Sequence, residues 1–277
     1  MNKKTFGSRL IASPYIVWSV IFIIVPLIMV VYYAFTDSDG AFTLENIGEL
    51  SRYSDTFLRS VLYAVAATVI CLVMSYPFAY FMTRRTKNKQ RTLMLLVMLP
   101  MWMNFLIRTY SWITILSNNG ILNSVFEFLG LGRFQLINTP GAVILGMVYN
   151  YIPYMIMPIY SVMCKIDTPL LEAADDLGSD GFMKLRKIIF PMSIPGIISG
   201  ITMVFVPCVS TFYISQKLGG GKTMLIGDVI EMQFQSSYNY NLGASISLVL
   251  MILILISLAV MNHFADKDNE DAGGLIV

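Results

Sequence analysis

Few residues of this chain have a type and a spacing that could perform chemistry. The 277 residues include one histidine, His263, and three cysteines, Cys71, Cys164 and Cys208. The cysteines stand far apart, within or at the end of apolar segments, which favours buried side chains over a disulfide framework or a thiolate metal site. His263 stands at the end of the last apolar run, without the neighbours that a metal site or a catalytic triad needs. We therefore predict no catalytic residue, no metal site and no cofactor bound by this chain.

The sequence Gly220-Gly221-Lys222-Thr223 resembles part of a nucleotide-binding loop. A P-loop needs a glycine five residues before Gly221, whereas that position holds Gln216. No soluble β-strand precedes the run either, so we reject it as an ATP site. If ATP drives this protein, another chain must bind it.

Asp228 and Glu231 are two carboxylates spaced i, i+3 after the fifth apolar run. In a helix this spacing places both side chains on one face. Such a pair near the outer mouth of a membrane path could attract a polycation. A structural turn, or a contact to another protein, is the alternative.

Arg108 is the one charged residue embedded in a predicted span. A charge in hydrocarbon costs at least a few kcal/mol unless it is paired or hydrated, so Arg108 is a functional candidate. Snorkelling to the outer interface is the alternative. Aromatic rings near the spans either form a headgroup belt or line a cation path, because ring faces attract ammonium groups by roughly 0.5–2 kcal/mol. These rings are Trp102, Tyr110, Tyr149, Tyr151 and Tyr154.

The composition indicates which elements must position these residues. Hydrophobic residues make up 56% of the chain and charged residues only 13%, against about 25% charged residues in soluble domains. A soluble protein could not hide so much apolar surface behind so few charges. The chain is therefore predicted to be an integral membrane protein.

Six uncharged runs predict six membrane-spanning helices, because about 20 apolar residues cross the ~30 Å hydrocarbon core. The third run reaches that length only if its helix continues past Arg108 into Thr109–Leu116. Gly196 and Gly200 in the fifth run allow close helix packing. The runs are Leu10–Thr36, Ser60–Thr83, Thr92–Ile107, Gly141–Met163, Ser193–Ser215 and Gly243–Asn262.

The basic residues predict the orientation of these spans. With the N-terminus inside, thirteen of the 19 Lys and Arg residues fall on the cytoplasmic side, as the positive-inside rule requires. We therefore predict a cytoplasmic N-terminus (residues 1–9), a six-span transmembrane domain (10–263) and a cytoplasmic tail (264–277). Both termini would be cytoplasmic, in a multi-pass protein of the cell membrane.

The cytoplasmic segment 164–192 is too long and too ordered in its pattern to be a plain loop. Thr168 and Pro169 predict the start of a short helix, with Thr168 as its cap. Leu170, Leu171, Ala174 and Leu177 then share one face at helical spacing. Gly178 predicts a left-handed helix end.

A second short helix is predicted after that glycine. Ser179 could cap it, Lys184, Arg186 and Lys187 make it basic, and Pro191 would terminate it. The resulting helix–glycine–helix elbow either lies on the lipid headgroups or docks on a cytosolic partner. We name residues 164–192 the coupling elbow.

The coupling elbow resembles the EAA signature of ABC-importer permeases. That signature is Glu-Ala-Ala, three residues, Gly, nine residues and Ile-x-Leu-Pro, and every spacing matches. The one departure is Phe190 in place of Leu, a tolerable apolar exchange. The residues to which the resemblance assigns ATPase coupling are Glu172, Ala173, Ala174, Gly178, Ile188 and Pro191.

Other blocks resemble permeases of the spermidine/putrescine type, most of all the first of their two permease subunits (PotB-like). One departure is Ser210-Thr211-Phe212, where related permeases carry Gly-Glu-Phe. The similar blocks are Leu99–Trp112, Gly146–Pro153 and the segment from Leu218 to Asp228.

The resemblance implies the six-span fold of a type I ABC importer permease (MetI-like). It also implies polyamine uptake together with a second permease, two copies of a cytosolic ATPase that binds ATP, and an external polyamine-binding protein. Alternatives are another small solute, such as an iron chelate or an oxyanion, or an ion-gradient-driven transporter. The last should show intramembrane Asp or Glu and a doubled repeat, and neither is present.

Overall fold

The computed structural model describes the backbone of residues 14–273 and the side chains of residues 14–263. Within that part, every regular element is a helix, so the predicted all-α membrane architecture is confirmed. The predicted N-terminus (1–9) and the side chains of the predicted tail (264–277) lie outside the described residues. Five helices are long and apolar enough to cross a membrane, namely Pro14–Ala34, Glu45–Thr83, Pro140–Met163, Gly181–Ser210 and Tyr240–His263.

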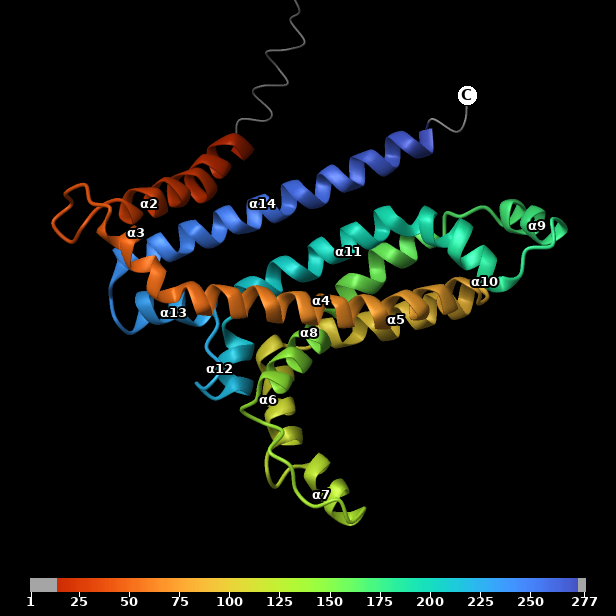
Figure 1. The fold of residues 1–277 in the computed structure, drawn as a ribbon, viewed down its shortest axis with the longest axis horizontal. Coiled ribbons are helices and arrows are strands. Elements are labelled where there is room, and N and C mark those ends of the chain that lie inside the picture. Colours follow the sequence, from red (N-terminus) through yellow and green to blue (C-terminus); the bar gives the residue numbers. More distant parts are fainter. Residues whose placement is uncertain (1–13, 274–277) are drawn as a thin grey trace, which may run out of the picture. The chain divides into compact units, whose positions relative to one another are not determined.

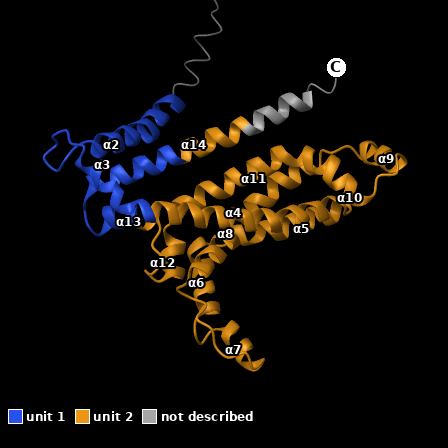
Figure 2. Ribbon diagram, in the orientation of Figure 1, with its two compact units in different colours: residues 1–55, 229–253 blue, residues 56–228, 254–277 orange. Residues whose placement is uncertain are grey.

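The chain forms two compact units (Figure 1, Figure 2). The first unit comprises residues 1–55 and 229–253. There Asn241 Nδ2 donates a hydrogen bond to Thr36 O at 2.6 Å, and Ser245 Oγ donates one to Ala34 O at 2.9 Å. These bonds fix the end of the first helix to the start of the last. The helices of this unit are η1 (Val20–Ile24), α2 (Val25–Ala34), α3 (Glu45–Glu49), η2 (Leu50–Tyr53), the part of α13 (Ile226–Gln235) from residue 229 onward and the part of α14 (Tyr240–Gly273) up to residue 253.

The second unit, residues 56–228 and 254–277, contains α8 (Pro140–Met163) and α11 (Phe190–Ser210) side by side (Figure 1). Two glycines of α11 explain their close approach. A Cβ at Gly196 would lie 2.9 Å from the carbonyl oxygen of Pro158, and one at Gly200 would lie 3.2 Å from that of Met155. The packing predicted for these glycines is therefore confirmed.

Helix α4 (Ser54–Thr83) completes this bundle with a row of small buried side chains. Their spacing of three or four residues places them on one face, which therefore packs inward. The Cys71 thiol on this face lies 3.8 Å from the carbonyl oxygen of Val148 on α8. The row is Ala64, Ala67, Cys71, Ser75 and Ala79.

The third predicted span is not one helix. α5 (Lys87–Trp102) and the helical segment Phe105–Phe128, which begins with α6 (Phe105–Leu116), meet at a bend of 90°. The prediction of one unbroken helix continuing to Leu116 is therefore wrong, but the bent pair taken together is the sixth candidate span. The cause is Asn104, whose side chain accepts a hydrogen bond from the Leu106 amide at 2.8 Å. It thereby caps a new helix instead of continuing the old one.

The fifth run also departs from the prediction. Its helix begins at Gly181 and ends at Ser210 rather than Ser215. A separate short helix, α12 (Tyr213–Gly219), follows, and α13 (Ile226–Gln235) comes next. Gly220 and Gly221 have φ angles of +56° and +75° and end α12, so the Gly-Gly-Lys-Thr run serves as a helix end.

Candidate functional site

The first helix of the coupling elbow is α9 (Thr168–Asp176), with Pro169 in its first turn. Its N-cap residue is Asp167, not Thr168 as predicted. The predicted helix is therefore present, but its N-cap residue lies one position earlier than predicted. Thr168 is the first residue of the helix and Pro169 the second, a position in the first turn where the missing amide hydrogen of proline costs no hydrogen bond.

Gly178 ends α9 in the predicted left-handed conformation, with φ of +78°. Its amide donates to Asp175 O at 2.8 Å, and the Ser179 amide donates to Ala174 O at 2.9 Å. These two bonds are those of a Schellman motif, which satisfies the last carbonyl groups of the helix. The sharp turn of the elbow is thus fixed by its own backbone.

The second helix of the elbow differs from the prediction at both ends. Asp180, not Ser179, caps it, because the Asp180 side chain accepts a hydrogen bond from the Met183 amide at 2.6 Å. Pro191 does not terminate it either. α10 (Gly181–Lys184) passes through a π-helical turn, η3 (Leu185–Ile189), into α11, so that one helix runs from Gly181 to Ser210.

The π-helical turn explains why Pro191 is tolerated. Proline lacks an amide hydrogen and clashes with the carbonyl group one turn before it in a regular α-helix. A π-turn directly before it shifts the hydrogen-bond pattern from i+4 to i+5. The elbow is therefore continuous with a membrane-spanning helix.

The surface of the elbow exposes apolar side chains. Leu177 and Phe182 are 87% and 71% exposed, whereas Ala174 is buried. The prediction that Leu177 shares a helix face with Ala174 is wrong, because the helix ends at residue 176 and Leu177 is its C-cap residue. An ion pair between Lys184 and Asp175 joins the two helices.

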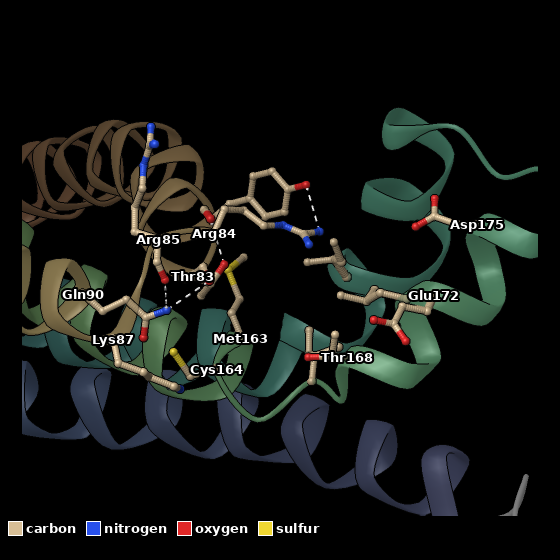
Figure 3. A pocket seen from close by; sticks show the side chains of 14 residues that line it. Thr83, Arg84, Arg85, Lys87, Gln90, Met163, Cys164, Thr168, Glu172 and Asp175 are labelled. Carbon is tan, nitrogen blue, oxygen red and sulfur yellow. Dashed lines mark hydrogen bonds between the residues drawn. The ribbon is translucent and has the colours of Figure 1, made fainter.

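A cavity of about 480 Å³ separates α9 from the basic loop between α4 and α5. Figure 3 shows Glu172 and Asp175 on one side of it and Lys87 on the other, with the Arg84 guanidinium between them and that of Arg85 turned away. The cavity therefore lies between groups of opposite charge. These groups belong to two segments that are far apart in the sequence.

Gln90 stabilises the basic side of this cavity. Its side-chain amide donates to Thr83 O at 3.1 Å and to Arg85 O at 2.7 Å, and its oxygen accepts from the Tyr160 hydroxyl at 3.0 Å. One buried side chain thus ties the loop to α5 and α8. Sequence reasoning missed Gln90, because a single glutamine in a basic loop carries no pattern.

Arg108 lies in a different part of the second unit and is only 8% exposed. Its Nε and Nη1 have no hydrogen-bond acceptor among the described residues, and its guanidinium carbon is 5.9 Å from the ring centroid of Phe105. The side chain is therefore buried within the subunit, which argues against snorkelling.

The predicted aromatic residues are only partly brought together. Tyr149 packs edge to face on Trp112 with ring centroids 5.3 Å apart, and Tyr110 contacts Tyr213 at 6.4 Å. Tyr151 packs on Tyr154 at 6.4 Å. Trp102, by contrast, stands at the end of α5 and is 73% exposed.

Asp228 and Glu231 lie on α13, as predicted, but Asp228 is only 4% exposed. Its carboxylate accepts hydrogen bonds from the Ser215 hydroxyl at 2.9 Å and the Leu225 amide at 2.7 Å. Of the two alternatives for Asp228, the geometry thus favours the structural one, since the carboxylate is used to join α12 to the start of α13. Sequence spacing could not distinguish this from an open carboxylate.

Residues 76–267, which contain the coupling elbow and the helices around it, match the family model described as "Binding-protein-dependent transport system inner membrane component". The chain belongs to this family. It is a multi-pass permease of the inner membrane. As an ABC importer permease it works with a partner permease, an ATPase and an external binding protein.

The permease is also similar to individual proteins. It is 40% identical over 227 residues to the "Spermidine/putrescine transport system permease protein PotB" of Escherichia coli (strain K12), covering 78% of this chain and 82% of that protein. A bacterial ABC transporter that imports the acidic polysaccharide alginate has the same fold, with a TM-score of 0.79 at 17% identity over 96% of both chains.

An inward-facing structure of the MetNI methionine ABC transporter matches with a TM-score of 0.61 at 15% identity, covering 80% of this chain and 98% of the other. At these identities the two solved structures speak for the fold alone. They confirm the predicted MetI-like importer permease fold.

Proposed function

We propose that this permease imports polyamines of the spermidine and putrescine class. It forms the translocation path with a second, homologous permease and receives its cargo from an external polyamine-binding protein. The observation that carries the proposal is the 40% identity to PotB over most of both chains. Two copies of a cytosolic ATPase supply the energy.

The geometry of the coupling elbow supports the way in which that energy reaches the path. Glu172, Ala173 and Ala174 lie on α9, a short helix whose exposed neighbours Leu177 and Phe182 offer apolar surface to a partner. Gly178 fixes the turn. Ile188 and Pro191 belong to the helix that continues into α11, so closure of the ATPase pair against the elbow tilts a membrane-spanning helix.

The residues proposed to line the path are Trp102, Arg108, Tyr110, Tyr149, Tyr154 and Glu231, with Asp228 shaping the wall rather than contacting cargo. Aromatic faces attract ammonium groups in such a path. A buried guanidinium with free donors repels them and thereby limits where a polycation can rest. The tyrosine rings and Arg108 would thus define attractive and repulsive positions along one route.

The decisive experiment is uptake by the complete complex in proteoliposomes with its binding protein. Radiolabelled spermidine should accumulate only with ATP and only with the binding protein present. Excess unlabelled putrescine should compete, whereas excess thiosulfate or an iron chelate should not. Competition by the anion and not by the polyamine would leave the importer assignment intact and overturn the cargo.

A further inference from the structure

The ammonium group of Lys217 lies over two tyrosine rings. Its Nζ is 5.7 Å from the ring centroid of Tyr110 on α6 and 5.7 Å from that of Tyr213 on α12. Both distances fall within the ~6 Å at which a ring face attracts a cation. We call Tyr110 and Tyr213 the tyrosine box.

The tyrosine box is partly exposed and borders a cavity. Tyr110 is 51% exposed, and Tyr213 and Lys217 are half-buried. A cavity of about 310 Å³ borders it, lined by residues that include Phe105, Tyr151, Thr211 and Tyr213. The Phe105 ring packs against Tyr213 with centroids 5.8 Å apart and so extends the aromatic wall. An alkyl chain that enters the cavity can therefore place an end group in the box.

The chemistry of lysine suggests what that end group is. A lysine side chain ends in four methylene groups and an ammonium group, which is also the structure of the aminobutyl arm of putrescine and spermidine. The contacts that hold Lys217 in the box would hold such an arm equally well. The subunit thus holds, in an aromatic site, a lysine butylammonium group that has the same structure as the aminobutyl arm of its proposed cargo.

We propose that the tyrosine box is an alkylammonium subsite of the polyamine path, which Lys217 occupies in the substrate-free permease and vacates when a polyamine arrives. This inference rests on the proposed polyamine function. When one ammonium group replaces another, the charge inside the tyrosine box stays the same. It also keeps binding weak, as transport requires of a site that cargo must leave.

Two cations near the box make the exchange reversible. The displaced Lys217 remains tethered close by, and Arg108 lies against Phe105, with its guanidinium carbon 5.9 Å from that ring centroid. Both repel a bound polyamine. The same arrangement disfavours a second polyamine entering behind the first.

Protection of a cysteine tests the subsite. Lys217→Cys is introduced into the complete complex, and its modification by the uncharged reagent N-ethylmaleimide is followed by peptide mass spectrometry, with and without spermidine. Lys222→Cys, on the exposed turn after α12, is the matched control. Sodium chloride at equal ionic strength and butan-1-ol control for screening and for the alkyl chain alone.

We expect spermidine to slow modification at position 217 and not at position 222, and neither control solute to do so. Adding Tyr213→Leu should raise the half-protecting spermidine concentration by roughly twofold to thirtyfold, the range of one cation–π contact. Tyr213→Phe keeps the ring face and should leave that concentration unchanged.

Two results would overturn the subsite. One is a complex that imports spermidine but shows no protection at position 217. The other is equal half-protecting concentrations for Tyr213→Leu and Tyr213→Phe. A wild-type complex that imports no polyamine would instead overturn the proposed function, and the subsite with it.

Discussion

The coupling elbow and the contact between α6 and α12 both contain charged side chains, but these side chains differ in their exposure to solvent. Glu172 in the elbow is exposed and has no ion pair among the described residues. Arg108 on α6 is 8% exposed. An exposed charge costs little and remains available to a partner, whereas a buried one is costly and acts on what lies beside it. The first arrangement suits docking and the second suits a selective path.

The two regions also differ in what fixes their geometry. The elbow is ordered by local backbone motifs, namely the Schellman turn at Gly178 and the cap at Asp180. The α6–α12 contact is ordered by side chains from distant parts of the chain, such as Tyr110 and Tyr213. Substitutions in the elbow should therefore affect coupling, and substitutions near α12 should affect folding or cargo.

The largest effect is expected for Gly178→Asp. A residue with a Cβ resists a positive φ by ~1–2 kcal/mol, and the carboxylate adds charge to a docking surface. The protein should remain in the membrane with its partner permease, while ATPase association or the coupling of hydrolysis to transport is lost. Co-purification of the ATPase and an uptake assay measure the two.

Gly178→Ala is the control for that substitution. No atom lies within 4 Å of the position that a Cβ would take at Gly178, so alanine brings the strain without a clash or a charge. Its effect should be intermediate. Normal ATPase association and normal uptake for Gly178→Asp would contradict docking through the elbow.

The next largest effect is expected for Asp228→Asn. In this variant an NH₂ group replaces one carboxylate oxygen, so either the Ser215 hydroxyl or the Leu225 amide loses its acceptor. Such a loss costs about 1–3 kcal/mol at a buried site. The amount of assembled complex should fall, as measured by size-exclusion chromatography. Glu231→Gln, on the same helix, should assemble normally.

The opposite result for Asp228→Asn is also informative. If the carboxylate served mainly to attract the polycation, the variant would assemble normally and import spermidine slowly. That outcome would return Asp228 to the cargo path and contradict the structural role argued from its hydrogen bonds.

A smaller effect is expected for Glu172→Lys. Charge reversal at the rim of α9 should weaken ATPase association without abolishing it, because an exposed ion pair contributes about 0.2–1 kcal/mol. Glu172→Gln should be milder still. If the elbow instead lay on anionic headgroups, lysine at this position would be harmless or would strengthen membrane contact, and ATPase pull-down would be unchanged.

The sequence predicted the elbow well because its signals are local. Pro169 and Gly178 act within one turn of their own backbone, so the start of the first helix, the glycine turn and the start of the second helix are predicted to within about one residue. The errors came from competing neighbours: Asp180 caps where Ser179 was expected, and the π-turn before Pro191 lets the helix continue. Neither competition is visible in hydrophobic periodicity.

The region around the contact between α6 and α12 was predicted poorly, because side chains from distant parts of the chain determine its geometry. Asn104 breaks the third span by capping a new helix. This break cannot be predicted from the apolar run, because the residues on both sides of it are equally apolar. The sequence gives no reason to pair Lys217 with Tyr110, since only the folded chain brings α12 against α6. Asp228, which is buried, and Glu231, which is half-buried, look alike in sequence for the same reason.

The smallest effect on transport is expected from three single cysteines that test the orientation underlying both regions. Lys87→Cys, Phe182→Cys and Lys222→Cys replace exposed side chains, and position 182 avoids the cap at Asp180. Uptake should change little for Lys87→Cys and Lys222→Cys, whereas Phe182→Cys removes part of the proposed docking surface and is judged by its labelling alone. A membrane-impermeant thiol reagent should label positions 87 and 182 only from the cytoplasmic side and position 222 only from outside. Labelling of position 182 from outside would place the coupling elbow beyond the reach of a cytosolic ATPase, because one unbroken helix joins that residue to α11.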